Sequence, residues 1–304
     1  MPFELTLIQI IVLALIQGAA ELLPVSSSAH VIVAEKLMGL DPSSPAMTFL
    51  LVMLHTGTMF AVLLYFWPRW KKLNREFFKM TLVATVVTAG VGLTLKKFIE
   101  TVILGYWLGE SHAEIEHLFK SLPLIAFSLF SVGIFIFFTG HKTDSGNKNV
   151  RAGAEKKRKG SKQPVVSHFS AMMIGAVQGL CLPFRGFSRS GATISTALLL
   201  KMTRAHAEDF SFALAVILTP PIVVKELYRL LKSAGHASDN GVIWSGDLWA
   251  LILPGLLGMV FSFGSGLLAL RFLSIWLEKG RWKFFGIYCI LAAFVVITLW
   301  RNGF

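Results

Sequence analysis

Two short stretches of the chain place charged, hydroxyl and imidazole side chains inside otherwise apolar sequence. The first, residues 17–30, contains Glu21, a proline, three consecutive serines and a histidine. The second, residues 184–193, contains Arg189 between two serines. An unpaired polar group in hydrocarbon costs several kcal/mol, so we expect such clusters to line a buried cavity with a function.

The first stretch predicts a helix, a break and a returning helix. Gln17 and Glu21 are four residues apart and share one face of the entering helix. The proline ends that helix, and the serines at 26–28 suit the N-terminal cap of the next one, with Ser27 and His30 three apart on it. A helix N-terminus offers unpaired N–H groups and a positive dipole end, which favour an anion.

The second stretch predicts a matching hairpin. Its first arm ends at Pro183, and Gly186 and Gly191 allow close backbone approach. Arg189 can hold a phosphate through two parallel hydrogen bonds. Two helix N-termini, one arginine, several hydroxyls and one carboxylate therefore predict a site that handles a phosphate.

Each of these residues also has a structural interpretation. Ser26 and its neighbour at position 28 could be plain caps or could bond backbone carbonyls. Glu21 and Arg189 could form a structural ion pair, and His30 could bridge two helices. His55 is expected to pack between helices or to line the site.

The composition is that of an integral membrane protein. Hydrophobic residues make up 54% of the 304 residues, charged residues only 15%, and the mean hydropathy is +0.65. Soluble domains have about a quarter charged residues. The net charge of +12 argues for a nucleic-acid partner only at first sight, because the basic residues gather in short loops between apolar segments, as the positive-inside rule expects.

The loop charges predict an orientation. Basic loops at 69–79, 141–164 and 271–283 belong in the cytoplasm, and both chain ends then fall on the other side. That parity requires residues 5–40 and 168–203 each to leave and return on one side, which favours a pair of re-entrant half-helices over two full spans. The predicted full spans are Met47–Trp67, Thr81–Leu95, Leu122–Thr139, Phe210–Leu230, Leu248–Leu270 and Phe284–Trp300.

The two halves of the chain have the same order of elements. Ile16-Gln-Gly18 recurs as Val177-Gln-Gly179, and each half holds one hairpin and three spans. Three is odd, so the second copy must lie inverted, with the two hairpins facing each other near the bilayer midplane. We therefore predict one all-α membrane domain over residues 1–304, with repeat one at about 1–140, the basic loop at 141–164 and repeat two at about 165–304.

These motifs resemble the signatures of the undecaprenyl-pyrophosphate phosphatase family of the BacA type, and the resemblance covers essentially the full chain. The first family signature is matched by Gly18, Glu21, Pro24, Ser26, Ser27 and His30. The second is matched by Gly186, Ser188, Arg189, Ser190, Gly191 and Thr193.

The resemblance implies hydrolysis of undecaprenyl pyrophosphate to undecaprenyl phosphate at the outer face of the bacterial cytoplasmic membrane. This reaction recycles a lipid carrier for cell-wall synthesis and is linked to bacitracin resistance. The resemblance also implies interlocked inverted repeats and dependence on a divalent cation, Mg²⁺ or Ca²⁺. A homodimer is possible.

The resemblance also implies roles for single residues. Ser27 would be the nucleophile, His30 would assist proton transfer, and Arg189 would stabilise charge on the phosphoryl group. Glu21 would hold the metal or activate the nucleophile. The expected phosphate-binding residues are Ser26, Ser188, Ser190, Thr193, Gly191 and Gln17.

Two positions depart from the family pattern. Gln17 stands where a second carboxylate is usual, and an amide cannot supply charge to a cation or act as a base. Arg185 stands where the family usually has proline. We expect an active phosphatase with a modified site; the alternative is a transporter that flips undecaprenyl phosphate through the same phosphate site.

Overall fold

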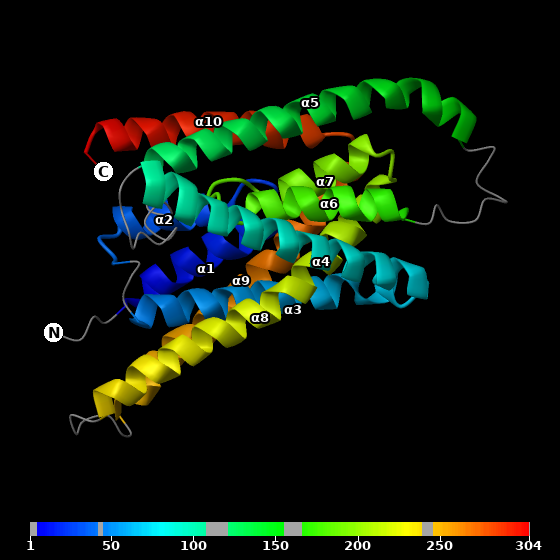
Figure 1. The fold of residues 1–304 in the computed structure, drawn as a ribbon. Helices are drawn as coiled ribbons and strands as arrows, with labels where there is room; N and C mark the ends of the chain where they lie inside the picture. The colour runs from blue at the N-terminus through cyan, green and yellow to red at the C-terminus, as the bar shows by residue number, and fades with distance from the viewer. Residues whose placement is uncertain (1–4, 42–44, 108–120, 155–165, 239–245, 304) are drawn as a thin grey trace.

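The computed structural model describes residues 5–41, 45–107, 121–154, 166–238 and 246–303. Over these residues the chain is helical and contains no β-strand, as the sequence predicts (Figure 1). The helices are α1 Leu7–Leu22, α2 Ser27–Leu37, α3 Pro45–Trp70, α4 Arg75–Phe98, the π-helix η1 Ile99–Trp107, α5 Leu122–Ala154, α6 His168–Cys181, α7 Arg189–Leu199, α8 Arg204–Ser238, α9 Gly246–Glu278 and α10 Trp282–Arg301.

Within the described residues, six helices are long and apolar enough to cross a membrane, and each contains one of the six predicted spans or most of it. They are Met47–Trp70, Arg75–Ile103, Leu122–Thr143, Arg204–Lys225, Ile252–Glu278 and Trp282–Arg301. The predicted span over 81–95 was the shortest, and the structure extends it at both ends. Hydropathy marks the apolar centre of a helix, whereas the hydrogen-bonded helix continues into Lys, Arg and Thr residues beyond it.

Two pairs of short helices occupy the positions of the predicted hairpins. The pair α1 and α2 is joined by residues 23–26, and the pair α6 and α7 by residues 182–188. At about 1.5 Å per residue, none of the four reaches the roughly 30 Å of a hydrocarbon core. This length is compatible with re-entrant hairpins, and their depth in a bilayer stays a prediction.

The two halves pack against each other reciprocally. Helix α1 lies along α9, and α6 lies along α4. A side chain at Gly18 would meet the Ser262 carbonyl oxygen at 2.6 Å, and one at Gly179 would meet the Thr88 carbonyl oxygen at 2.9 Å. The repeated Gln-Gly pair therefore permits the same close helix contact in both halves. Inverted repeats would require reciprocal packing of this kind. The division of the chain into inverted repeats itself stays a prediction.

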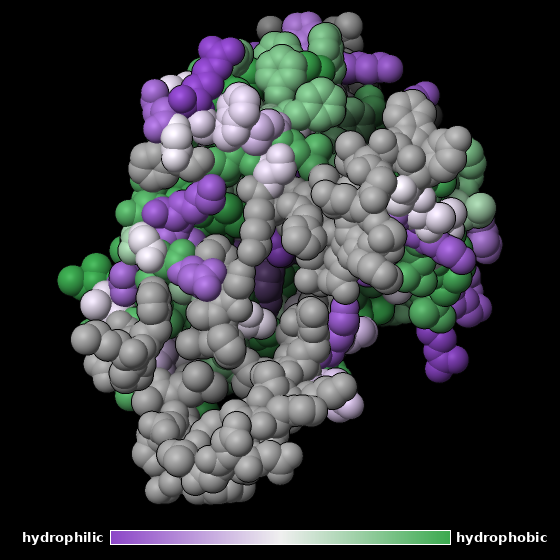
Figure 2. Space-filling view, turned by 60° about the vertical axis from the view of Figure 1, so that its left-hand side comes forward, coloured by the Kyte–Doolittle hydropathy of each residue, from purple (hydrophilic) through white to green (hydrophobic). Residues whose placement is uncertain are grey.

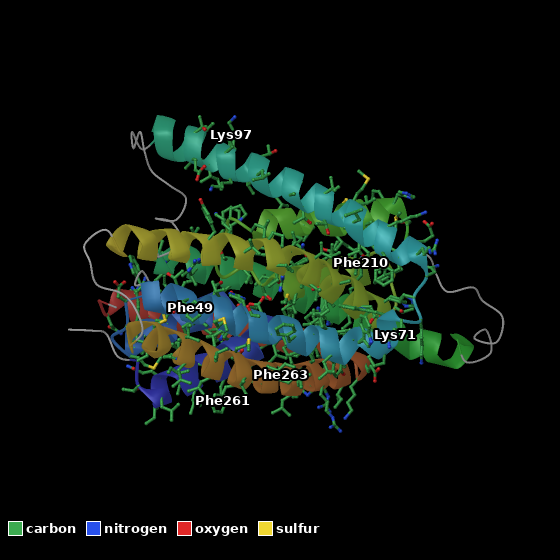
Figure 3. All side chains as sticks on the ribbon, turned by 90° about the horizontal axis from the view of Figure 1, so that it is seen from below. Phe49, Lys71, Lys97, Phe210, Phe261 and Phe263 are labelled. Carbon is green, nitrogen blue, oxygen red and sulfur yellow. The ribbon has the colours of Figure 1, made fainter. Side chains whose placement is uncertain are left out.

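The positions of the helix ends agree with the predicted orientation, in which the basic loops lie on one side and the two ends of the chain on the other. The start of α1 and the end of α10 lie at the left end of the bundle in Figure 1, whereas the turns that join α3 to α4 and α9 to α10 lie towards the right. Lys71, in a basic turn, and Lys97, in a segment of balanced charge, lie at opposite ends of the molecule (Figure 3). The basic turns thus share one side.

The loop boundaries differ from the sequence prediction. Helix α5 continues to Ala154, so the predicted loop at 141–164 begins as helix, and beyond the predicted span at 81–95 the chain stays helical to the end of η1. Hydropathy locates the end of an apolar segment, and a helix can continue past that point. The basic run Lys156–Lys159 lies outside the described residues.

The core joins both halves, while apolar side chains also cover the outside. Phe66, Phe210, Phe212 and Trp282 are fully buried in one cluster. Many leucines, valines and phenylalanines on the outward faces of the spans are exposed, which suits contact with lipid. Figure 2 shows apolar areas of this kind on the sides of the molecule.

Candidate active site

The turns of the two hairpins meet, and hydrogen bonds join them. Ser190, in the first turn of α7, donates to the Leu23 carbonyl oxygen at 3.2 Å. The backbone N–H of Gly186 reaches Ser28 Oγ at 3.4 Å. Cys289 of α10 lies 3.2 Å from the Pro24 carbonyl oxygen and holds the first turn from its other side. The N-termini of α2 and α7 are therefore brought together.

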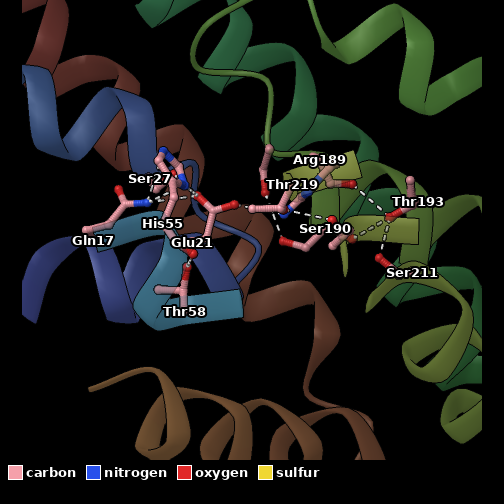
Figure 4. A network of polar contacts seen from close by, with 12 residues as sticks. Gln17, Glu21, Ser27, His55, Thr58, Arg189, Ser190, Thr193, Ser211 and Thr219 are labelled. Atoms are coloured by element: carbon pink, nitrogen blue, oxygen red, sulfur yellow. Dashed lines mark hydrogen bonds and ion pairs between the residues drawn. The ribbon is translucent and has the colours of Figure 1, made fainter. Parts of the chain in front are cut away.

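Glu21 is at the centre of the polar cluster that results. One carboxylate oxygen, Oε1, lies 2.8 Å from Arg189 Nη2. The other, Oε2, accepts a hydrogen bond of 2.5 Å from Ser27 Oγ and one of 3.1 Å from Gln17 Nε2. The cluster thus joins a hydroxyl, a carboxylate and a guanidinium from both halves of the chain (Figure 4).

His55 of α3 completes the cluster on the side of α1. Its Nδ1 lies 3.0 Å from Gln17 Nε2 and 3.7 Å from Glu21 Oε2. The carboxylate can only accept hydrogen bonds, so the group that Gln17 turns towards it is its NH₂. The same NH₂ lies nearer to His55 Nδ1 than to Nε2, which is 3.5 Å away, so we assign Nδ1 as the acceptor and place the imidazole proton on Nε2.

A small pocket opens beside this cluster, between α3 and α8. Its lining is partly polar and partly apolar, and Glu21 and Arg189 keep part of their side chains accessible. The lining residues are Glu21, Leu22, His55, Thr58, Met59, Val62, Arg189, Ala215, Val216 and Thr219. An anionic group attached to an apolar chain would find both kinds of surface here.

A family model described as bacitracin resistance protein BacA matches residues 10–295. The chain belongs to the BacA family.

Members of the family from several bacteria are similar over nearly their whole length. Undecaprenyl-diphosphatase 2 of Acinetobacter baylyi is 53% identical over 306 aligned residues, which cover 98% of this chain and 100% of the relative. The undecaprenyl-diphosphatase of Desulfosudis oleivorans is 35% identical, covering 96% of this chain and 97% of its own. That of Desulforudis audaxviator is 31% identical, covering 95% and 96%.

The four residues to which the BacA resemblance assigned catalytic roles do not all meet. Glu21 contacts both Ser27 and Arg189. His30 faces away from them: its Nδ1 lies 2.8 Å from the Ser26 carbonyl oxygen and its Nε2 lies 2.7 Å from the Tyr288 hydroxyl. Its expected part in proton transfer stays a prediction, and its bonds indicate that it holds the turn before Ser27.

That turn contains an unusual backbone conformation. Ser26 has φ 68° and ψ 94°, and its side chain makes no cap bond to α2. A non-glycine residue in this region stores strain, and such residues gather at functional sites. The expected cap by the serines is therefore replaced by a strained residue directly before Ser27. The Ser26 hydroxyl instead lies 3.3 Å from that of Ser28.

The expected phosphate ligands of the second hairpin are mostly engaged elsewhere. Ser188 caps α7 by accepting from the Gly191 N–H at 3.2 Å. Thr193 is fully buried and lies 2.6 Å from Ser211 Oγ. Neither they nor Ser190 and Gly191 line the pocket. Their contacts with phosphate stay predictions, and the structure gives them positioning bonds.

Sequence reasoning missed Thr58, Thr219 and Tyr288, and it treated His55 as a general lining residue. Thr58 and Thr219 line the pocket, and Tyr288 contacts His30. The one available signal was the weak correspondence between the segments that hold Thr56 and Thr219, each with a Phe seven residues earlier.

A metal that the family implies would have one carboxylate to bind, that of Glu21. Among the residues that the structure describes, no group of three or more His, Cys, Asp or Glu side chains could hold a metal ion. Both oxygens of Glu21 already face protein donors. Mg²⁺ and Ca²⁺ prefer several oxygen ligands, so the residues present do not fit either ion well.

Proposed function

We propose that the chain is an undecaprenyl-diphosphatase, which hydrolyses undecaprenyl pyrophosphate to undecaprenyl phosphate and inorganic phosphate. Membership of the BacA family and relatives named for this activity support the proposal. The site observation behind it is the contact of Glu21 with Ser27 on one side and Arg189 on the other. The product is the lipid carrier of cell-wall synthesis. The family model is described as bacitracin resistance protein, so we propose that the chain also contributes to resistance to bacitracin.

The first chemical step is attack by Ser27. Glu21 Oε2 accepts the hydroxyl hydrogen at 2.5 Å and is placed to take the proton as Oγ bonds to the terminal phosphorus. The bond from that phosphorus to the bridging oxygen breaks, and undecaprenyl phosphate leaves with the electron pair. Arg189 stabilises the negative charge that develops on the phosphoryl oxygens.

The second step regenerates the enzyme. Water attacks the phosphorus of phosphoserine, and the bond from phosphorus to Ser27 Oγ breaks. Glu21 returns its proton to that oxygen, while the water oxygen leaves in inorganic phosphate and the second water proton goes to solvent. Glu21 is thus base in one step and acid in the next.

The pocket suits the substrate because its lining is of two kinds. Leu22, Met59 and Val62 offer apolar contact beside Glu21 and Arg189. A polyprenyl pyrophosphate has an anionic head on an apolar chain. We propose that the head lies at Arg189 while the first isoprene units contact the apolar residues between α3 and α8.

The chain is a multi-pass membrane protein by its six apolar helices. We propose that it lies in the bacterial inner membrane with the site open to the periplasmic side. The support is the charge of the turns: the basic turns share one end of the bundle, which the positive-inside rule assigns to the cytoplasm.

The test is release of inorganic phosphate from farnesyl or undecaprenyl pyrophosphate by the purified full-length protein. We expect release by wild type and none above background by Ser27→Ala. Binding of undecaprenyl phosphate without any release, with or without divalent cations, would reject the enzyme. It would favour the alternative transporter, which flux of undecaprenyl phosphate across proteoliposomes would then test.

A further inference from the structure

The carboxylate that a divalent cation would need already accepts from three protein donors. Glu21 Oε1 pairs with Arg189 at 2.8 Å, and Oε2 accepts from Ser27 at 2.5 Å and from Gln17 at 3.1 Å. A cation bound to Oε2 would displace one of its two donors. At Oε1 it would meet the guanidinium charge.

Gln17 adds a donor at the position where a second carboxylate would add a ligand. Its NH₂ must face Glu21, because an amide oxygen there would repel the carboxylate. Gln17 is 1% exposed and its NH₂ also contacts His55, so turning its oxygen inward would cost both hydrogen bonds at a position that water does not reach. This side of the site therefore presents N–H groups where Mg²⁺ or Ca²⁺ requires oxygens.

His55 can bind the anion instead. Gln17 Nε2 lies 3.0 Å from His55 Nδ1 and 3.5 Å from Nε2, so Nδ1 is assigned as the acceptor and the proton to Nε2. His55 lines the same pocket as Arg189. An imidazole N–H and a guanidinium give a terminal phosphoryl group two protein partners from opposite halves of the chain.

We infer that this chain binds the terminal phosphoryl group through His55 and Arg189 and does not hold a divalent cation at Glu21. The inference rests on the proposed function, since it concerns the same site and the same substrate. It makes His55 a catalytic residue, with Gln17 the positioning residue that fixes its tautomer.

Direct cation binding is the first test. Purified protein without substrate is titrated with Mn²⁺, and free Mn²⁺ is followed by electron paramagnetic resonance. We expect wild type to bind none below ~1 mM, whereas Gln17→Glu, which restores an oxygen ligand next to Glu21, binds with a dissociation constant at least ~10-fold lower. Gln9→Glu is the matched control: it makes the same change on α1, at a position whose capping box accepts Glu. Binding by wild type that Glu21→Gln abolishes would overturn the inference, even if Gln17→Glu does not fold.

Activity in a chelator is the second test. We expect wild type to release phosphate from farnesyl pyrophosphate in excess EDTA within ~3-fold of its rate with Mg²⁺, and Gln17→Glu to lose at least ~10-fold until Mg²⁺ is added. His55→Ala should raise KM and lower kcat/KM by ~10- to 100-fold in EDTA, and His55→Gln, which keeps an N–H donor, should recover part of the loss.

The outcomes separate the two proposals. Activity that appears only with a divalent cation would overturn the inference and leave the phosphatase in place. Absence of activity under every condition would reject the phosphatase itself. Unchanged kinetics in His55→Ala would remove His55 from phosphate binding.

Discussion

Ser27 donates a hydrogen bond of 2.5 Å to Glu21, and Glu21 in turn contacts Arg189 of the other half of the chain. This relationship makes Glu21 the base for Ser27. We predict that Ser27→Ala lowers kcat by at least ~100-fold, because the covalent route is lost. The measurement is phosphate release from farnesyl pyrophosphate, together with trapping of labelled phosphoserine after an acid quench.

Glu21→Gln separates the base from the nucleophile. We expect a similarly large loss of kcat and no trapped phosphoserine, because the amide cannot take the proton. Near-normal turnover in Ser27→Ala would show that water attacks directly and would transfer the role of Glu21 to activation of that water.

Arg189 must provide charge in a particular shape. We predict that Arg189→Ala lowers kcat/KM by at least ~100-fold and that Arg189→Lys recovers only part of it, because an ammonium keeps the charge but loses the planar pair of donors. Full activity in Arg189→Lys would mean that the site needs only a positive charge there. The control is Lys142→Ala, which also removes one positive charge but at a residue that does not line the pocket; its kcat/KM should be unchanged.

The sequence was sufficient to predict the helices and the part of the candidate site that the two hairpins form. Hydropathy located six spans, and the proline breaks located both hairpins, because these properties depend on neighbouring residues. Glu21, Ser27 and Arg189 were predicted to share one site; Glu21 contacts the other two, and their catalytic roles stay predictions.

Contacts that depend on how distant helices pack could not be predicted. His55 and Tyr288 reach the first hairpin from α3 and α10, and nothing in the local sequence indicates how those helices are rotated. The same applies to Ser188 and Thr193, since a hydroxyl can cap a helix or bind a ligand, and only the packing of α7 decides.

Tyr288 is predicted to act through His30. Because the Ser26 carbonyl can only accept, His30 Nδ1 is the donor, and Nε2 is held by the Tyr288 hydroxyl at 2.7 Å. Tyr288→Phe removes one hydrogen bond, worth about 0.5–1.5 kcal/mol, so kcat should fall by about 2- to 10-fold with KM and the pH profile unchanged. A shifted pH profile would instead indicate that His30 moves a proton in the reaction. Phe294→Leu on α10 tests for general disturbance of that helix.

Ser26 is predicted to carry backbone strain. Its φ of 68° is easily adopted by glycine, so Ser26→Gly should be more stable than Ser26→Ala by about 1 kcal/mol, although both lose the hydroxyl. Thermal unfolding of the two variants in the same detergent measures the difference. Equal stability would show that the turn relaxes without strain.

Arg69 is predicted to be the largest single electrostatic contribution to stability outside the site. Arg69 Nη1 lies 2.8 Å from Glu208 and Nε lies 2.9 Å from Asp209, and both carboxylates are buried. Ser274 of α9 also hydrogen-bonds to Glu208, so the network joins α3, α8 and α9. Arg69→Ala would leave two buried acids without their cation, and we expect a loss of about 3–5 kcal/mol.

The control for Arg69 is an ion pair of the same kind on the surface. Lys79 and Glu76 lie 2.8 Å apart, with both side chains exposed, so Lys79→Ala should cost less than about 1 kcal/mol. Arg69→Ala combined with Glu208→Gln and Asp209→Asn should recover much of the lost stability, because the uncompensated charges are gone. Denaturant unfolding in detergent compares the variants. If the Arg69→Ala protein were as stable as the Lys79→Ala protein, water would have to reach the two acids. The network would then not stabilise the packing of α3 against α8 and α9.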